Sequence, residues 1–185
     1  MTLPTRTEAE ASLHEYVADE YQRYHALMVA TAMAGYARLR GEDEELWWLT
    51  GYLHDLDYDK HPTEHPGPSL IWFGDWGYPA ELIHAIEAHA NGFNGFTTKP
   101  ETDLARALIA CDEICGIFYA YHKLNPIPFG EMKVKSIRKR LKETRFAPGI
   151  DRGHIYAGCE DFGVSLDEHI ENLITFFAEL PAPQV

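Results

Sequence analysis

The stretch EDEELWWLTGYLHDLDYDK, residues 42–60, decides the fold class. Its acidic start suits the positive end of a helix, and the apolar residues that follow predict a helix from Glu42 to about Leu53. His54 follows at the inward spacing of that helix. Residues 54–79 then contain four prolines and three glycines, which predict a loop with room for a short helix at Pro68–Gly74.

Helical periodicity also dominates the rest of the chain, and no run shows the alternating pattern of a strand. The remaining predicted helices cover residues 8–39 with a break near Glu20, 79–90, 101–124, 133–144, 152–162 and 165–180. These elements predict an all-α fold, a compact bundle of about six to eight helices.

Bulk composition places the chain among ordinary globular proteins. It has 185 residues, of which 45% are hydrophobic, enough for the core of one domain. No apolar run is long enough for a membrane span, and the first residues lack the apolar stretch of a secretory signal. Three cysteines without paired spacing do not predict a disulfide framework. These features predict a cytoplasmic protein.

The charge is unevenly distributed. The net charge is −13, which disfavours nucleic acids and anionic membranes as partners because both would repel such a surface. Residues 131–145 nevertheless contain seven basic and two acidic side chains, so the remainder has a charge of −18. In this segment Lys135, Arg138, Lys139 and Lys142 have helical spacing and could bind a small anionic substrate. A solvated helix face is the other interpretation.

Four predicted helices each turn one metal-binding residue toward their apolar side: His25, His54, His89 and Asp112. By the same helical phase, His84 and Glu113 point to the opposite sides of their helices. Burying such polar groups costs several kcal/mol unless they have partners. A shared cation would neutralise the carboxylate and use the imidazole lone pairs. The four residues therefore predict a buried metal site.

These residues resemble the HD-domain superfamily of metal-dependent phosphohydrolases. The family pattern is a His on one helix, a His-Asp pair that ends a later helix, and a distant Asp on a long helix. Here that pattern corresponds to His25, His54-Asp55 and Asp112, and GYLHDLDYDK is similar to small bacterial members described as predicted hydrolases. The resemblance implies a single HD-type domain over residues 1–185, with a metal-site core at about 20–125 and a helical extension at about 131–181.

Some members of the superfamily hold two metal ions through two further histidines, and His65 and His89 fit those positions in order. The resemblance thus implies one ion at His25, His54, Asp55 and Asp112. A second ion would be held by His65 and His89, with Asp55 as the bridge. Such ligands suit Fe, Mn, Co, Ni or Zn. The other interpretation of His65 is a plain loop histidine.

The resemblance implies hydrolysis of a small phosphate ester or a nucleotide, with Asp55 helping to orient water. Asp57, Asp59 or Lys60 would act in proton transfer or charge stabilisation. Two alternatives remain at this point: a mixed-valent di-iron oxygenase of the same superfamily, and a non-catalytic module that binds a nucleotide or a metal. The aromatic residues at 71–76 leave room for a homodimer.

Overall fold

The structure, a computed structural model, describes residues 2–183. These residues form nine α-helices and two short 3₁₀ helices, with no strand, so the all-helical prediction is confirmed. The chain divides into two compact units, one ending at Leu108 and the other beginning at Ile109. The expected single domain with a core at about 20–125 stays a prediction.

The first unit contains the segments that bear the predicted histidines. Its helices are α1 (Arg6–Tyr16), α2 (Glu20–Arg40), α3 (Glu44–Leu53), α4 (Gly67–Asp75), α5 (Ala80–His89) and the start of α6 (Asp103–Leu124). The predicted break near Glu20 is present because Asp19 caps α2 by accepting a hydrogen bond from the Gln22 backbone N–H.

Capping residues also fix the bounds of α2 and α3. Gly41 ends α2 in the left-handed conformation, with φ of 75°, where glycine has no steric penalty. Asp43 then caps α3 by accepting hydrogen bonds from the backbone N–H groups of Glu45 and Leu46. The two caps leave only a short connection between the helices.

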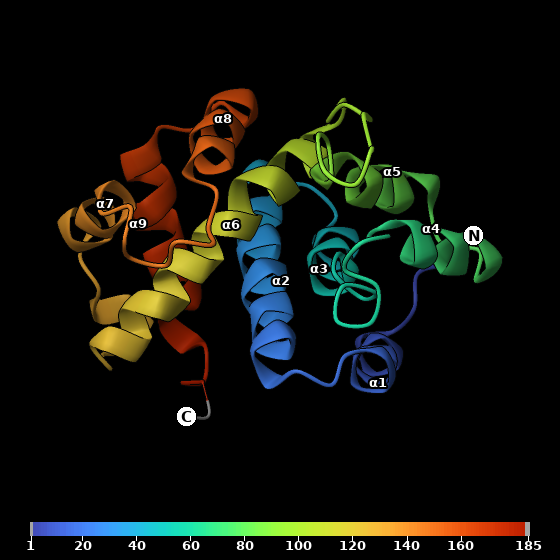
Figure 1. The fold of residues 1–185 in the computed structure, drawn as a ribbon, viewed down its shortest axis with the longest axis horizontal. Helices are drawn as coiled ribbons and strands as arrows, with labels where there is room; N and C mark the ends of the chain where they lie inside the picture. Colours follow the sequence, from blue (N-terminus) through green and yellow to red (C-terminus); the bar gives the residue numbers. More distant parts are fainter. Residues whose placement is uncertain (1, 184–185) are drawn as a thin grey trace. The chain divides into compact units, whose positions relative to one another are not determined.

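A glycine allows α2 and α3 to pack side by side (Figure 1). A Cβ atom on Gly51 would lie 2.9 Å from the Cα atom of Ala30, closer than packed atoms allow. This contact matters for the site because His25 lies on α2 and His54 follows α3.

The second unit contains the end of α6 and the C-terminal helices. Its other elements are η1 (Phe129–Glu131), α7 (Val134–Lys142), α8 (Arg152–Phe162), α9 (Leu166–Phe176) and η2 (Phe177–Glu179). The helix predicted at 165–180 is therefore α9 followed by η2, and η1 was not predicted. Helices α7 and α9 lie side by side (Figure 1).

None of the helices described is both long enough and apolar enough to span a membrane.

His169 on α9 makes the second unit sensitive to acid. Its imidazole is fully buried and its Nε2 donates to the carbonyl of Ala110, 2.8 Å away. Burial outweighs this hydrogen bond and lowers the pKa of His169 from 6.5 to about 4. Between these two values the unfolded chain binds a proton that the folded chain does not, so folding becomes less favourable as pH falls.

We therefore expect His169→Gln, which keeps a donor at this position, to reduce the acid sensitivity of folding. Between pH 6.5 and pH 4 the wild type should lose up to about 3 kcal/mol more unfolding free energy than the variant. Urea denaturation of both metal-free proteins across this range measures the difference. Equal pH dependence in the two proteins would contradict the buried neutral imidazole.

Candidate metal centre

Five of the predicted ligands meet in the first unit. His25 lies on α2, His54 is the residue that caps the end of α3, and Asp55 follows it in a turn. His65 lies in the turn before α4, and His89 is the last residue of α5. Four segments that are distant in sequence therefore supply side chains to one cluster.

The two carboxylate oxygens of Asp55 face different pairs of histidines. Oδ2 lies 3.3 Å from Nε2 of His54 and 4.0 Å from Nε2 of His25. Oδ1 lies 3.4 Å from Nε2 of His65 and 3.6 Å from Nε2 of His89. The described residues thus contain two groups able to hold an ion, and Asp55 belongs to both.

Hydrogen bonds on the outer side of three imidazoles set which nitrogen faces the cluster. Nδ1 of His54 donates to the carbonyl of Gly51 at 2.8 Å, and Nδ1 of His89 donates to the carbonyl of Ile86. Nδ1 of His65 lies 2.6 Å from Oδ1 of Asp57 and donates to it. In the neutral ring each Nε2 then presents a lone pair to the cluster.

These lone pairs require positive charge between them. Nε2 of His65 and Nε2 of His89 are 3.1 Å apart, and two lone pairs at that distance repel each other. One shared proton would satisfy a single pair of atoms, whereas metal cations would satisfy the imidazoles and the carboxylate together. Imidazole and carboxylate ligands suit Fe, Mn, Co, Ni or Zn better than Ca or Mg. The residues therefore fit a transition-metal site.

Asp55 is an ionised carboxylate with some access to solvent. Burial raises the pKa of Asp55, but the electrostatic influence of the surrounding histidines, His54 first and then His89 and His65, holds it well below the usual value. Its side chain is 17% exposed, whereas those of the four histidines are 9% exposed or less. Asp55 is therefore the most solvent-accessible of the five clustered side chains.

The acidic and basic residues after Asp55 make other contacts. Asp57 is fully buried against His65. Asp59 accepts hydrogen bonds from the backbone of Ala18 and Asp19, in the connection between α1 and α2. Lys60 donates to the carbonyl of Glu15, 3.0 Å away, at the end of α1. Catalytic roles for Asp57 and Lys60 stay predictions, and these contacts give both residues structural partners.

Helix α5 contains two histidines, His84 and His89, and both are half-buried. His89 belongs to one of the two metal-binding groups, whereas neither group found among the described residues includes His84. Asp112 is half-buried on α6 and belongs to the second unit. Its role as a ligand stays a prediction.

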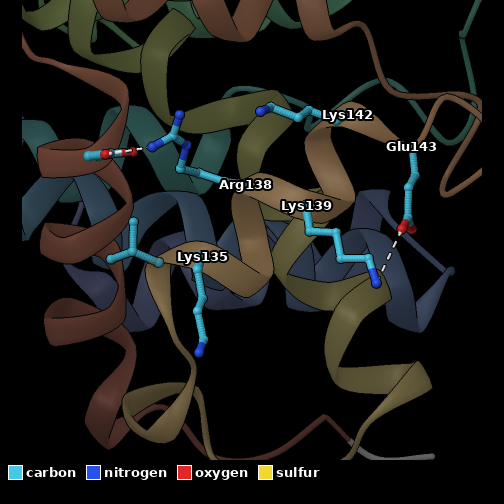
Figure 2. Close-up of a pocket in the computed structure, with 7 residues that line it drawn as sticks. Lys135, Arg138, Lys139, Lys142 and Glu143 are labelled. Atoms are coloured by element: carbon cyan, nitrogen blue, oxygen red, sulfur yellow. Dashed lines mark hydrogen bonds and ion pairs between the residues drawn. The ribbon is translucent and has the colours of Figure 1, made fainter.

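The predicted anion-binding residues lie on α7. Lys135, Arg138, Lys139 and Lys142 line a hollow in the surface of the second unit (Figure 2). Two of them have acidic partners: Arg138 is 2.9 Å from Asp167, and Lys139 is 3.9 Å from Glu143. The hollow is lined by four basic and two acidic side chains, so its net charge is positive. Substrate binding here stays a prediction, as does the alternative of a solvated face.

Sequence reasoning missed Asn94, which supports the loop of His65. The Asn94 side-chain amide donates to the carbonyl of His65 at 2.9 Å and to that of Pro62 at 3.0 Å. Its backbone is left-handed, with φ of 47°, a conformation that Asn tolerates better than most residues. The sequence of this segment, NGFNG, indicates a turn, but nothing in it identifies His65 as the partner.

Comparisons with known proteins agree with this geometry. The family model described as HD domain matches residues 23–116 of the 185-residue chain, a range that begins just before His25 and ends after Asp112. The comparison with curated proteins gave no match, and neither did the comparison with solved structures. HD-domain proteins are generally metal-dependent hydrolases. The family match and the cluster of His and Asp side chains together place this chain in the HD-domain family.

Proposed function

We propose that this chain is a metal-dependent phosphohydrolase that acts on a small phosphate ester or a nucleotide. The observation that carries the proposal is the position of Asp55, whose two oxygens each face a pair of histidine Nε2 atoms. When bound, one or two divalent transition-metal ions would supply Lewis acidity and lower the pKa of water toward neutrality.

The residues of the chain have distinct parts in this proposal. His25 and His54 would hold one ion and His65 and His89 the other, with Asp55 shared between them. Asp112 on α6 remains a predicted further ligand. The partly exposed carboxylate of Asp55 would orient the attacking water beside the substrate. The anion-binding role proposed for Lys135, Arg138 and Lys139 is supported by the net positive charge of the hollow on α7.

A phosphatase screen of metal-stripped protein tests the proposal. We expect phosphate release from at least one class of phosphate monoester or nucleotide only after Mn, Co, Ni, Fe or Zn is restored. Chelation should abolish that release, and re-addition of the metal should restore it. If no metal binds, or if a metal-loaded protein releases no phosphate from any member of a broad panel, phosphohydrolase activity is excluded.

The shared carboxylate also supports a second function, a mixed-valent di-iron oxygenase. Two ligand groups joined by one Asp could hold an iron pair as well as a hydrolytic pair. Iron retained through purification, with substrate-dependent O₂ uptake and no phosphate release, would favour the oxygenase. Tight binding of a metal or nucleotide without turnover would instead favour a regulatory module.

A further inference from the structure

Asp57 is a buried carboxylate with a single imidazole partner. It lies two residues after Asp55 in the turn that follows α3, and no part of its surface is exposed. Its Oδ1 is 2.6 Å from Nδ1 of His65. A residue with no exposed surface does not meet a substrate from solvent, so its influence acts through the groups that it contacts.

The other oxygen of Asp57 fixes the carboxylate in place. Oδ2 accepts a hydrogen bond from the backbone N–H of Ser69, 3.2 Å away, in the first turn of α4. A negative charge near a helix N-terminus is stabilised by the helix dipole. Both oxygens of Asp57 act as acceptors, so Asp57 connects the turn after α3 to the start of α4. His65 belongs to the segment that joins this turn to α4.

His65 differs from its neighbours in the kind of partner that orients it. His54 and His89 donate to backbone carbonyls, which no side-chain substitution removes. His65 donates to the side chain of Asp57, and Asn94 separately holds the backbone of His65. The orientation of the His65 ring can therefore be changed without changing the position of its backbone.

We propose that Asp57 is a positioning residue that holds the proton of His65 on Nδ1, so that the Nε2 lone pair faces Asp55 and His89. This inference rests on the proposed metal centre and deepens it, because it makes the second ligand group depend on Asp57. Carboxylates that accept a hydrogen bond from a ligating imidazole fix its tautomer and raise its basicity. Loss of such a partner typically weakens metal binding by about 10- to 100-fold.

The test compares Asp57→Asn with Asp59→Asn. Both residues lie in the same turn and both accept backbone hydrogen bonds, but Asp59 has its contacts at Ala18 and Asp19. Equilibrium dialysis against Mn²⁺, with metal counted by elemental analysis, should show one equivalent weakened by about 10- to 100-fold in Asp57→Asn. The other equivalent should be retained, and Asp59→Asn should match the wild type.

Nitrogen NMR of the metal-free proteins gives a second readout that needs no bound ion. The His65 ring should carry its proton on Nδ1 in the wild type, and the Nε2–H form should gain population in Asp57→Asn. Unchanged Mn²⁺ binding in Asp57→Asn, or equal weakening of both equivalents, would overturn the inference. If the variant does not fold, the wild-type spectrum decides, since a proton on Nε2 of His65 is incompatible with the proposed role.

The same experiment separates this inference from the proposed function. A wild-type protein that binds no Mn²⁺ would count against the metal centre, while the NMR comparison would still show whether Asp57 sets the tautomer of His65. A protein that binds two equivalents regardless of Asp57 would support the metal centre and overturn only the positioning role.

Discussion

Asp55→Asn is expected to abolish most of the proposed phosphohydrolase activity and to remove bound metal. The substitution keeps the shape of the side chain but replaces a carboxylate shared by two ligand groups with a neutral amide. In the native protein the four imidazole Nε2 atoms lie 3.3 to 4.0 Å from the oxygens of Asp55. In the variant, the hydrogens of the amide would face one pair of these atoms. Since metal ions contribute several kcal/mol to transition-state stabilisation, kcat/KM should fall about 1000-fold or more.

Steady-state phosphate release and metal content, measured on the same preparations, check this expectation. Asp59→Asn is the matched control because it removes a carboxylate from the same turn, and that carboxylate binds the backbone of Ala18 and Asp19. The control should keep its bound metal, because Asp59 belongs to neither ligand group. An Asp55→Asn protein that kept both ions and at least a tenth of wild-type kcat/KM would show that Asp55 is not the shared ligand.

The helices were predictable because their signals are local. Asp43 and Gly41 mark helix ends by their own chemistry, and apolar spacing on α5 favoured His89 over His84 as the residue that joins the cluster. Such patterns depend only on residues within a few positions of each other. The order of His25, His54-Asp55, His65 and His89 then indicated which inward residues would meet.

The contacts of the turn after α3 were not predictable in the same way. Asp57, Asp59 and Lys60 are close in sequence to Asp55 and therefore looked equally suited to proton transfer. Their partners are His65, the connection between α1 and α2, and the end of α1, which lie 8 to 45 positions away. A single sequence does not encode these pairings in any local pattern, so only the folded chain distinguishes the three side chains.

The role of Gly51 in helix packing was also not predictable from the sequence. A glycine inside a predicted helix weakens the local helical signal, and its value lies in the close approach of Ala30 on α2. That approach is a tertiary property, and the carbonyl of the same residue accepts the hydrogen bond from His54. One position therefore serves helix packing and ligand orientation, although its residue type alone suggests neither.

Metal binding is expected to stabilise the fold in two separable steps. An ion that binds only the folded chain raises the unfolding free energy by about 2.7 kcal/mol when its free concentration is 100 times its Kd. Two ions at the groups that share Asp55 should therefore add about 5 kcal/mol, and Asp55→Asn should lose nearly all of it. Urea denaturation with and without Mn²⁺ measures this increment independently of any substrate.

His89→Asn should lose about half of the increment, because it removes a ligand from the group of Asp55, His65 and His89 and leaves His25 and His54 in place. His84→Asn is the matched control on the same helix, and it should keep the whole increment since His84 belongs to neither group. Comparing increments, rather than total stabilities, cancels any effect of each substitution on the metal-free fold. An unchanged increment in His89→Asn would mean that the second group holds no ion. Metal binding would then be limited to the group of His25, His54 and Asp55.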